Sequence, residues 1–329
     1  MNAKETKLPE YILKEKFNIK LDEVAGLVKA KEVLKESIID PVKIPKILEN
    51  NQNPLKGILL YGPPGAGKTY LAKAVGTEFK GNLFTVNGPI LVSKWNAQSK
   101  QEIIIKDLFE YAKKNKPAVI LLDEIDFMTK TNNENDVMND TTRKLKQEFL
   151  IQMQNLNSDD GVVVLGVASK PWKLDPLVRK CFQKKLYINL PEFNARKILF
   201  ELNLKKNSHT LTNEQIEYLA KNTELFSCSD IYNLTQQTIY EPIKKCQKVE
   251  YFKKIKGING HEWNYIPCEQ NDPDAIKMKM EEIKDPKEII FPEVNFDDFK
   301  NVLGRTKPTM TVEEMKKYEK FEEEFGQEE

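Results

Sequence analysis

The segment GPPGAGKT, residues 62–69, has the GxxxxGK[ST] spacing of a phosphate-binding loop. An apolar run precedes it at 57–61 and an amphipathic segment follows at 70–79, so the loop would join a strand to a helix. Glycines let backbone N–H groups turn inward and hold phosphate oxygens, and the start of the helix adds a favourable dipole. We predict that Lys68 neutralises β- and γ-phosphate charge and that the Thr69 hydroxyl ligates Mg²⁺. The predicted nucleotide-binding residues here are Gly62, Pro63, Pro64, Gly65, Ala66, Gly67, Lys68, Thr69 and Tyr70.

A second chemical signal is ILLDEID, residues 120–126, in which an apolar strand delivers two carboxylates to its end. An acidic pair after a strand is by itself more often a solvated strand end. The phosphate-binding loop upstream changes that interpretation to hydrolytic machinery. Asp123 would then hold Mg²⁺ through water, and Glu124 would polarise the attacking water.

Short apolar strands that alternate with helices are expected to position these residues. The expected strands are 57–61, 83–86, 118–122, 162–167 and 186–188, and the helices between them are 70–79, 99–115 and 141–154. A helical segment at 27–48 precedes the first strand. This alternation predicts an α/β fold with a parallel sheet covered on both faces.

The pattern changes after Pro191. Expected helices at 194–204, 213–222 and 229–247 are followed by β-like runs at 251–255, 264–268 and 275–280, and by a final helix at 311–325 with a Thr311–Glu314 capping box. We therefore predict a tail at 1–20, a large α/β domain at 21–192 and a small helical domain at 193–329. The small domain would include a β insertion at about 250–285 and the C-terminal helix.

Composition excludes several functions. The 329 residues carry 51 Lys+Arg against 50 Asp+Glu, a net charge of +1 that argues against a nucleic-acid-coating protein. No apolar stretch approaches the roughly 18 residues that cross a bilayer, and the N-terminus lacks a secretory apolar region, which predicts a protein inside the cell. The cysteines are then expected to be free thiols. His209 and His261 lie far apart and outside any HExxH, which argues against zinc hydrolysis.

Longer segments resemble the AAA ATPases of the meiotic clade. They are LDEVAGLVKAKEVLKESI, GILLYGPPGAGKTYLAKAVGTE, LVSKW, LLDEID, KPWKLD and LYINLPE. Within the clade, the β insertion and the ending PEVNFDDF…RTKPTM…FEEEFGQEE are similar to the vacuolar protein sorting ATPases that disassemble ESCRT-III polymers. Microtubule-severing members usually lack the inserted β domain, so a severing ATPase is the alternative.

The resemblance implies further roles. Ala25 and Gly26, after Val24, fall where the family closes on adenine. Lys94 and Trp95 fall in the first pore loop, where an aromatic side chain grips the substrate backbone, although Trp95 as a core residue is the competing interpretation. The polar run 131–142 would be the second pore loop or simply a solvated loop.

Three segments depart from the family pattern. Ser169 stands at the sensor-1 position, where the family has an asparagine that orients the attacking water. The segment that supplies paired arginine fingers reads Arg179-Lys180-Cys181-Phe182, so lysine and cysteine occupy the two positions before Phe. Lysine lacks the planar guanidinium fork and cysteine carries no positive charge there. Cys228 replaces a glycine near the nucleotide.

Two hypotheses of different classes follow. The first is a hexameric ATPase that uses ATP and Mg²⁺ to thread ESCRT-III-like proteins through its pore. Its hydrolysis would be slowed by Ser169, Lys180 and Cys181, unless Arg179 serves as the finger through a shift of register. The second is a catalytically weak nucleotide-binding subunit that joins a hexamer with a complete paralogue. Either would be cytoplasmic and recruited to endosomal membranes through partners, with an adaptor on the β insertion and no nucleic acid. The family normally carries an N-terminal microtubule-interacting-and-trafficking helical bundle, and the residues before the expected AAA core are too few to hold one. We therefore expect the sequence to be either a fragment or a divergent paralogue.

Overall fold

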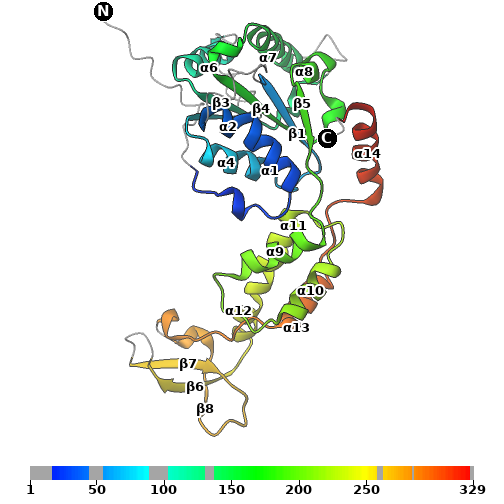
Figure 1. Ribbon diagram of the computed structural model, residues 1–329. Coiled ribbons are helices and arrows are strands. Elements are labelled where there is room, and N and C mark those ends of the chain that lie inside the picture. Colours follow the sequence, from blue (N-terminus) through cyan, green and yellow to red (C-terminus); the bar gives the residue numbers. More distant parts are fainter. Residues whose placement is uncertain are drawn as a thin grey trace, which may run out of the picture. The chain divides into compact units, whose positions relative to one another are not determined.

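The computed structural model describes residues 17–43, 55–88, 103–129, 137–257, 262–283 and 285–326. These residues divide into two compact units (Figure 1). Unit 1 comprises Met1–Leu190 and Met310–Glu329, and unit 2 comprises Pro191–Thr309.

Unit 1 is built on a five-stranded sheet with the order β2-β3-β4-β1-β5, and all of its pairings are parallel. Its strands are β1 (Gly57–Tyr61), β2 (Asn82–Asn87), β3 (Ala118–Asp123), β4 (Val162–Ala168) and β5 (Lys184–Tyr187). Every residue of β1 is buried. Ile58 and Leu60 belong to one hydrophobic cluster, whereas Leu59 and Tyr61 belong to another, because successive side chains of a strand point to opposite faces. The predicted parallel sheet with two covered faces is confirmed.

The helices of unit 1 cover the two faces (Figure 1). Residues of α1 (Val28–Leu34) and α4 (Lys68–Glu78) pack in the cluster that contains Ile58. Residues of α6 (Ile103–Lys114), α7 (Val137–Gln154) and α8 (Pro176–Lys180) pack in the other. After α1 the helix continues through a π turn, Lys35–Ile39, into α2 (Asp40–Lys43).

The helices of unit 1 differ in places from the sequence-based expectation, and α7 begins at Val137, four residues before the expected start. Helix α4 begins at Lys68, two residues before the expected Tyr70, because Gly67 at its N-cap has a φ of +96° that releases the chain directly into the helix. Helix α8 was not predicted. Asp175 caps it by accepting the N–H of Leu177 over 2.9 Å, and Pro176 occupies its first position.

The C-terminal helix α14 (Val312–Phe325) belongs to unit 1, so our assignment of residues 311–325 to the small domain is wrong. Its Tyr318 and Phe321 are 2% and 3% exposed. The Phe321 ring packs edge-on against Tyr61 of the sheet at 5.1 Å between centroids. The Tyr318 ring stacks on Tyr187 of β5, and burial of the two rings against the sheet outweighs the sequence proximity of α14 to unit 2.

Unit 2 contains five α-helices among its described residues, and α9, α10, α11 and α13 contribute to a core that includes Phe200, Leu219, Ile231 and Phe299. They are α9 (Phe193–Leu204), α10 (Asn213–Lys221), α11 (Cys228–Ile239), α12 (Glu241–Cys246) and α13 (Phe296–Leu303). The single helix expected at 229–247 is divided into α11 and α12, because Pro242 has no N–H to continue the helical hydrogen bonds.

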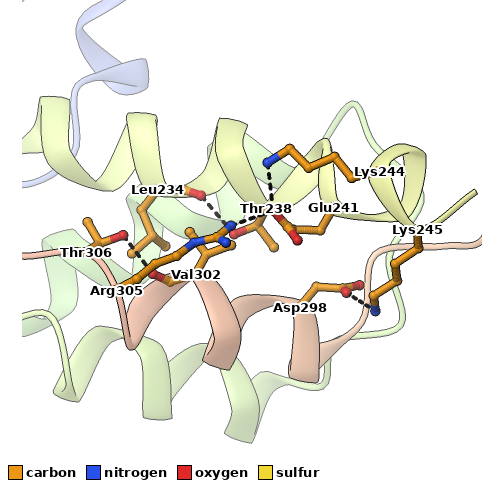
Figure 2. Close-up of polar contacts among 9 residues, drawn as sticks. All are labelled: Leu234, Thr238, Glu241, Lys244, Lys245, Asp298, Val302, Arg305 and Thr306. Carbon is orange, nitrogen blue, oxygen red and sulfur yellow. Dashed lines mark hydrogen bonds and ion pairs between the residues drawn. The ribbon is translucent and has the colours of Figure 1, made fainter. Parts of the chain in front are cut away.

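Helix α13 was also not predicted. Asn295 caps it by accepting the Asp298 N–H over 3.1 Å, and the Asp298 carboxylate accepts the Asn295 N–H over 3.0 Å. Figure 2 shows how α13 is tied to α12: Lys245 contacts the buried carboxylate of Asp298. The chain beyond α13 is also held to α12, because the Glu241 carboxylate of α12 accepts a hydrogen bond from the Arg305 guanidinium over 2.5 Å.

The remaining part of unit 2 is a small antiparallel sheet with the order β7-β6-β8. Its strands are β6 (Tyr251–Lys256), β7 (Trp263–Pro267) and β8 (Ala275–Lys277). Phe252 of β6 is fully buried and packs with Ile283 and Ile289. The predicted β insertion is confirmed.

Candidate active site

Three of the sequence-predicted segments meet at one edge of the sheet. The strands β3, β4 and β1 are neighbours in that order, and all three are parallel. Their carboxyl ends therefore lie side by side. The phosphate-binding loop follows β1, the acidic pair ends β3, and Ser169 follows β4.

The loop after β1 has a backbone that requires glycine. Gly62 has a φ of +151°, and a Cβ at this position would lie 2.0 Å from the carbonyl oxygen of Ile188. The loop then turns so that Ala66 N–H donates to the Pro63 carbonyl over 3.3 Å. Only glycine therefore fits where the loop passes close to Ile188, the residue after β5.

Lys68, the first residue of α4, is only 5% exposed. Its ammonium donates to the carbonyl oxygens of Gly62 over 2.9 Å and Pro63 over 2.7 Å. Burial lowers the pKa of Lys68 to about 8, while Asp126 and Asp123 act in the opposite direction. A buried ammonium at the start of a helix is suited to receive phosphate charge.

Thr69 and Asp123 bring two oxygen donors together. Thr69 Oγ1 donates to Oδ1 of Asp123 over 3.0 Å, which joins the start of α4 to the end of β3. A hydroxyl and a carboxylate are hard oxygen ligands of the kind that Mg²⁺ takes, alongside substrate phosphates. The donor set at this position therefore fits a magnesium ion.

Glu124 lies directly beyond this pair and is exposed. Its backbone has a φ of +55°, a left-handed conformation that is uncommon for a non-glycine residue. The Glu124 N–H donates to the Asp123 carboxylate over 3.0 Å, which helps to hold the turn. Such strained conformations concentrate at functional sites. The conformation is consistent with a carboxylate turned out toward a reacting water.

The segment predicted to contact adenine lies before α1. Ala25 is half-buried, Gly26 has a φ of +63°, and the preceding Val24 is buried. Just before this segment, the Leu21 N–H donates to the carboxylate of Glu78, the last residue of α4, over 3.1 Å. Val24 packs in the same hydrophobic cluster as residues of α4, so the segment lies against that helix.

Ser169 is held by two residues that our sequence analysis missed. Asp126 accepts the Ser169 N–H over 2.8 Å and the Lys170 N–H over 2.6 Å. Tyr318 of α14 donates its hydroxyl to the Ser169 carbonyl over 2.6 Å. The signal for Asp126 was present as the last residue of ILLDEID, whereas Tyr318 lies 149 residues from Ser169 and has no local signal.

The finger segment lies at the end of α8. The guanidinium carbon of Arg179 is 3.7 Å from the centroid of the Phe325 ring and 5.5 Å from that of Phe321, both on α14. Lys180 is exposed. The Cys181 thiol donates to the Leu177 carbonyl over 3.4 Å, and burial raises its pKa, so it stays uncharged. Lys180 is the one exposed cation of this triplet.

Two family models match the chain. The model "ATPase family associated with various cellular activities (AAA)" covers residues 58–190, and "Vps4 C terminal oligomerisation domain" covers residues 265–326. Vacuolar protein sorting-associated protein 4A of Rattus norvegicus is 40% identical over 339 aligned positions, which span 99% of this chain and 76% of the relative. The chain belongs to the Vps4 family of AAA ATPases.

Two other relatives come from neighbouring branches. The probable spastin homolog spas-1 of Caenorhabditis briggsae is 38% identical over 70% of this chain and 42% of its own length. The crystal structure of the FIGL-1 AAA domain has a TM-score of 0.77 at 28% identity, covering 97% of this chain and 93% of that domain. As a member of the Vps4 family, the chain is a nucleotide-binding ATPase. Its residues 265–326 match the family's oligomerisation domain.

The pore positions of this Vps4 family member are only partly within the structure. Lys94 and Trp95 lie outside the described residues, as do residues 131–136 of the predicted second pore loop. The rest of that loop, 137–142, belongs to the first turns of α7, so it is helical and not a loop.

Within the described residues, no helix is long and apolar enough to cross a bilayer.

Proposed function

We propose that this chain is a subunit of a hexameric ATPase that disassembles ESCRT-III-like protein polymers. The proposal rests above all on the Vps4 C-terminal oligomerisation module together with 40% identity to a vacuolar protein sorting-associated protein 4A. Under this proposal the subunit works in the cytoplasm and reaches endosomal membranes through its partners. The small sheet of β6, β7 and β8 is a candidate surface for an adaptor.

In this proposal ATP and Mg²⁺ bind at the carboxyl edge of the sheet. The backbone of residues 62–67 and the ammonium of Lys68 hold the phosphates, and Ala25 and Gly26 contact the adenine. Thr69 and Asp123 hold the magnesium ion, which neutralises phosphate charge. The fit of Mg²⁺ is supported by the 3.0 Å contact between the Thr69 hydroxyl and the Asp123 carboxylate.

The hydrolytic step divides between Glu124 and Ser169. Glu124 polarises the attacking water, and its exposed, left-handed position supports this role. Ser169 orients that water with a hydroxyl that offers one donor, where the family asparagine offers an amide. Charge that develops on the γ-phosphate is stabilised by Lys68 from within the chain.

Hydrolysis by this chain alone is proposed to be slow. In a hexamer the finger segment acts on the neighbouring subunit's nucleotide, and Lys180 supplies one flexible ammonium where a guanidinium fork is expected. Cys181 supplies no charge, and Arg179 lies against Phe325 of its own chain. An arginine finger raises kcat roughly 10³- to 10⁵-fold, so the loss of both fingers would be the largest single cause of slow turnover.

A second candidate function follows from the same observation. The chain would be a weak subunit of a mixed hexamer, in which a paralogue with both arginines supplies the fingers. Mixing the two proteins would then restore turnover at sites where this chain contributes Glu124. A microtubule-severing function is the less supported alternative, because the oligomerisation module matched at residues 265–326 is that of Vps4.

Trp95→Ala tests the proposed translocation activity. If Trp95 grips substrate in the pore, the variant keeps ATP turnover within a few-fold of wild type but no longer disassembles ESCRT-III-like filaments. The matched control is Trp263→Ala, which removes an exposed tryptophan of β7 and is expected to keep disassembly in the absence of an adaptor. Two results would contradict the pore assignment. One is a melting temperature of Trp95→Ala far below that of wild type, which would make Trp95 a core residue, and the other is filament disassembly at the wild-type rate.

A further inference from the structure

The backbone of Ser169 is gripped from both sides by groups that the proposed hydrolysis does not use directly. Its N–H donates to Asp126 over 2.8 Å and its carbonyl accepts from Tyr318 over 2.6 Å. We propose that Tyr318 and Asp126 are positioning residues that fix Ser169 for hydrolysis, so that the C-terminal helix completes the catalytic edge. This inference rests on the proposed role of Ser169 in hydrolysis.

Ser169 needs such support because of its place at the end of β4. Ala168 is the last residue of that strand to pair with β1, opposite Tyr61. Ser169 therefore lies just beyond the sheet ladder. Asp126, three residues beyond the end of β3, and Tyr318, from α14, replace the ladder bonds that the strand no longer offers. A serine side chain is short, so its hydroxyl can reach a reacting water only from an accurately placed backbone.

Asp126 links this position to the phosphate-binding lysine as well. Its two carboxylate oxygens accept the N–H groups of Ser169 and Lys170, and its charge raises the pKa of Lys68 against the effect of burial. The Asp126 carboxylate thus acts electrostatically on the lysine proposed to hold phosphate and is hydrogen-bonded to the serine proposed to orient water. These hydrogen bonds link the turn after β3 to the turn after β4 at the catalytic edge.

Tyr318 is built as a fixed donor. It is 2% exposed, and its ring lies edge-on to Trp172 at 4.9 Å and stacks with Tyr187 at 6.2 Å between centroids. Burial, followed by Tyr187, Asp126 and Glu314, raises the pKa of the Tyr318 hydroxyl. The hydroxyl therefore stays protonated and its bond to the Ser169 carbonyl persists over the working pH range.

Helix α14 also lies within the segment matched by the oligomerisation module, residues 265–326. The Tyr318–Ser169 hydrogen bond therefore joins the last helix of the matched segment to the hydrolytic edge within unit 1. A single hydroxyl carries this connection, and its removal leaves the ring packing of α14 in place.

The test uses Tyr318→Phe in the full chain, with Tyr187→Phe as the matched control. The Tyr187 hydroxyl contacts Asn189 and not Ser169, although its ring packs in the same aromatic group. Tyr318→Phe is expected to lower kcat by about 3- to 10-fold, the range that one hydrogen bond contributes. The KM for ATP, ADP affinity and hexamer formation should stay within 2-fold, and Tyr187→Phe should match wild type.

A double-mutant cycle with Ser169→Ala separates positioning from general stability. If Tyr318 acts through Ser169, then Tyr318→Phe has no further effect in the Ser169→Ala background. The cycle is measured in two ways. The first readout is ATP turnover, and the second is the retention of ADP with aluminium fluoride and Mg²⁺, which requires binding but no turnover.

The two readouts separate failure of the inference from failure of the proposed function. Wild-type turnover no higher than that of Glu124→Gln would contradict the proposed hydrolysis, and the cycle measured by ADP–aluminium fluoride retention would still test the positioning.

Four results would overturn the inference. The first three are an additive effect of the two substitutions, a Tyr318→Phe protein with unchanged kcat and unchanged analogue retention, and an equal loss in Tyr187→Phe. A fall in kcat matched by a proportional loss of hexamer or of ADP affinity would likewise assign Tyr318 a purely structural role.

Discussion

The guanidinium of Arg179 rests on the ring of Phe325, with 3.7 Å between the guanidinium carbon and the ring centroid. The two residues come from α8 and from the last position of α14. Phe321 flanks the same guanidinium at 5.5 Å. An arginine at the start of a finger triplet is thus engaged by the C-terminal helix of its own chain, which leaves Lys180 as the exposed cation of that triplet.

Restoring the two arginines should raise turnover. We expect Lys180→Arg combined with Cys181→Arg to increase ATP turnover by about 10-fold or more at saturating ATP, because planar guanidinium groups would then meet the γ-phosphate charge. The gain should stay below the full finger effect, because Ser169 is unchanged. Arg179→Ala serves as the comparison. Fast wild-type turnover that neither change alters, in preparations with equal hexamer content, would exclude these positions as the limit on catalysis.

The Arg179–Phe325 contact should be measurable as a coupling energy. In a double-mutant cycle of Arg179→Ala and Phe325→Ala, urea unfolding is expected to give a coupling of about 0.5–1 kcal/mol, the usual size of an exposed cation–π contact. The same cycle with exposed Lys173→Ala in place of Arg179→Ala should give a coupling near zero. Equal couplings in the two cycles would show that the stacked geometry contributes nothing specific.

Nucleotide binding should take up a proton in mildly alkaline solution. Burial holds the pKa of Lys68 at about 8 in the nucleotide-free chain, below its ordinary value of 10.5. Between these two values the folded chain binds fewer protons than the unfolded chain, so nucleotide-free stability rises with pH in that window. Bound phosphates favour the charged ammonium, so ATP affinity should fall as pH rises above about 8.

Calorimetry in two buffers of different ionisation enthalpy checks this coupling. At pH 8.5 ATP binding should take up a substantial fraction of one proton, whereas at pH 6.8 the protonated Lys68 should take up almost none. Lys68→Ala should abolish binding, because both a donor and the charge that neutralises phosphate are lost. Proton uptake that is the same at both pH values would argue against a depressed pKa at Lys68.

The sequence predicted those parts of the site that depend on neighbouring residues. The phosphate-binding loop, the acidic pair of β3 and the parallel sheet each follow from residue patterns within a short stretch of sequence. The strand order, which the sequence did not predict, then brings the loop and the acidic pair together. The expected helix starts were off by a few residues where a cap, such as Gly67 for α4, decided the boundary.

The parts that sequence reasoning missed depend on contacts between distant segments. The Tyr318–Ser169 bond joins residues 149 positions apart, and α14 was assigned to the small domain because nothing local indicates that Phe321 packs on Tyr61. Asp126 was overlooked for a different reason. Its role is to accept two backbone N–H groups from the turn after β4, and no spacing within ILLDEID encodes that turn.

The central claim is that the carboxyl edge of this sheet binds and hydrolyses ATP, with Glu124 activating the water. The most direct test is Mg²⁺-dependent phosphate release by the purified wild type and by Glu124→Gln, with ATP binding measured on both. We predict a slow, Mg²⁺-dependent release by the wild type that is absent in Glu124→Gln, although the variant binds ATP as tightly. Equal release by the two proteins, or loss of ATP binding in Glu124→Gln, would contradict the assignment.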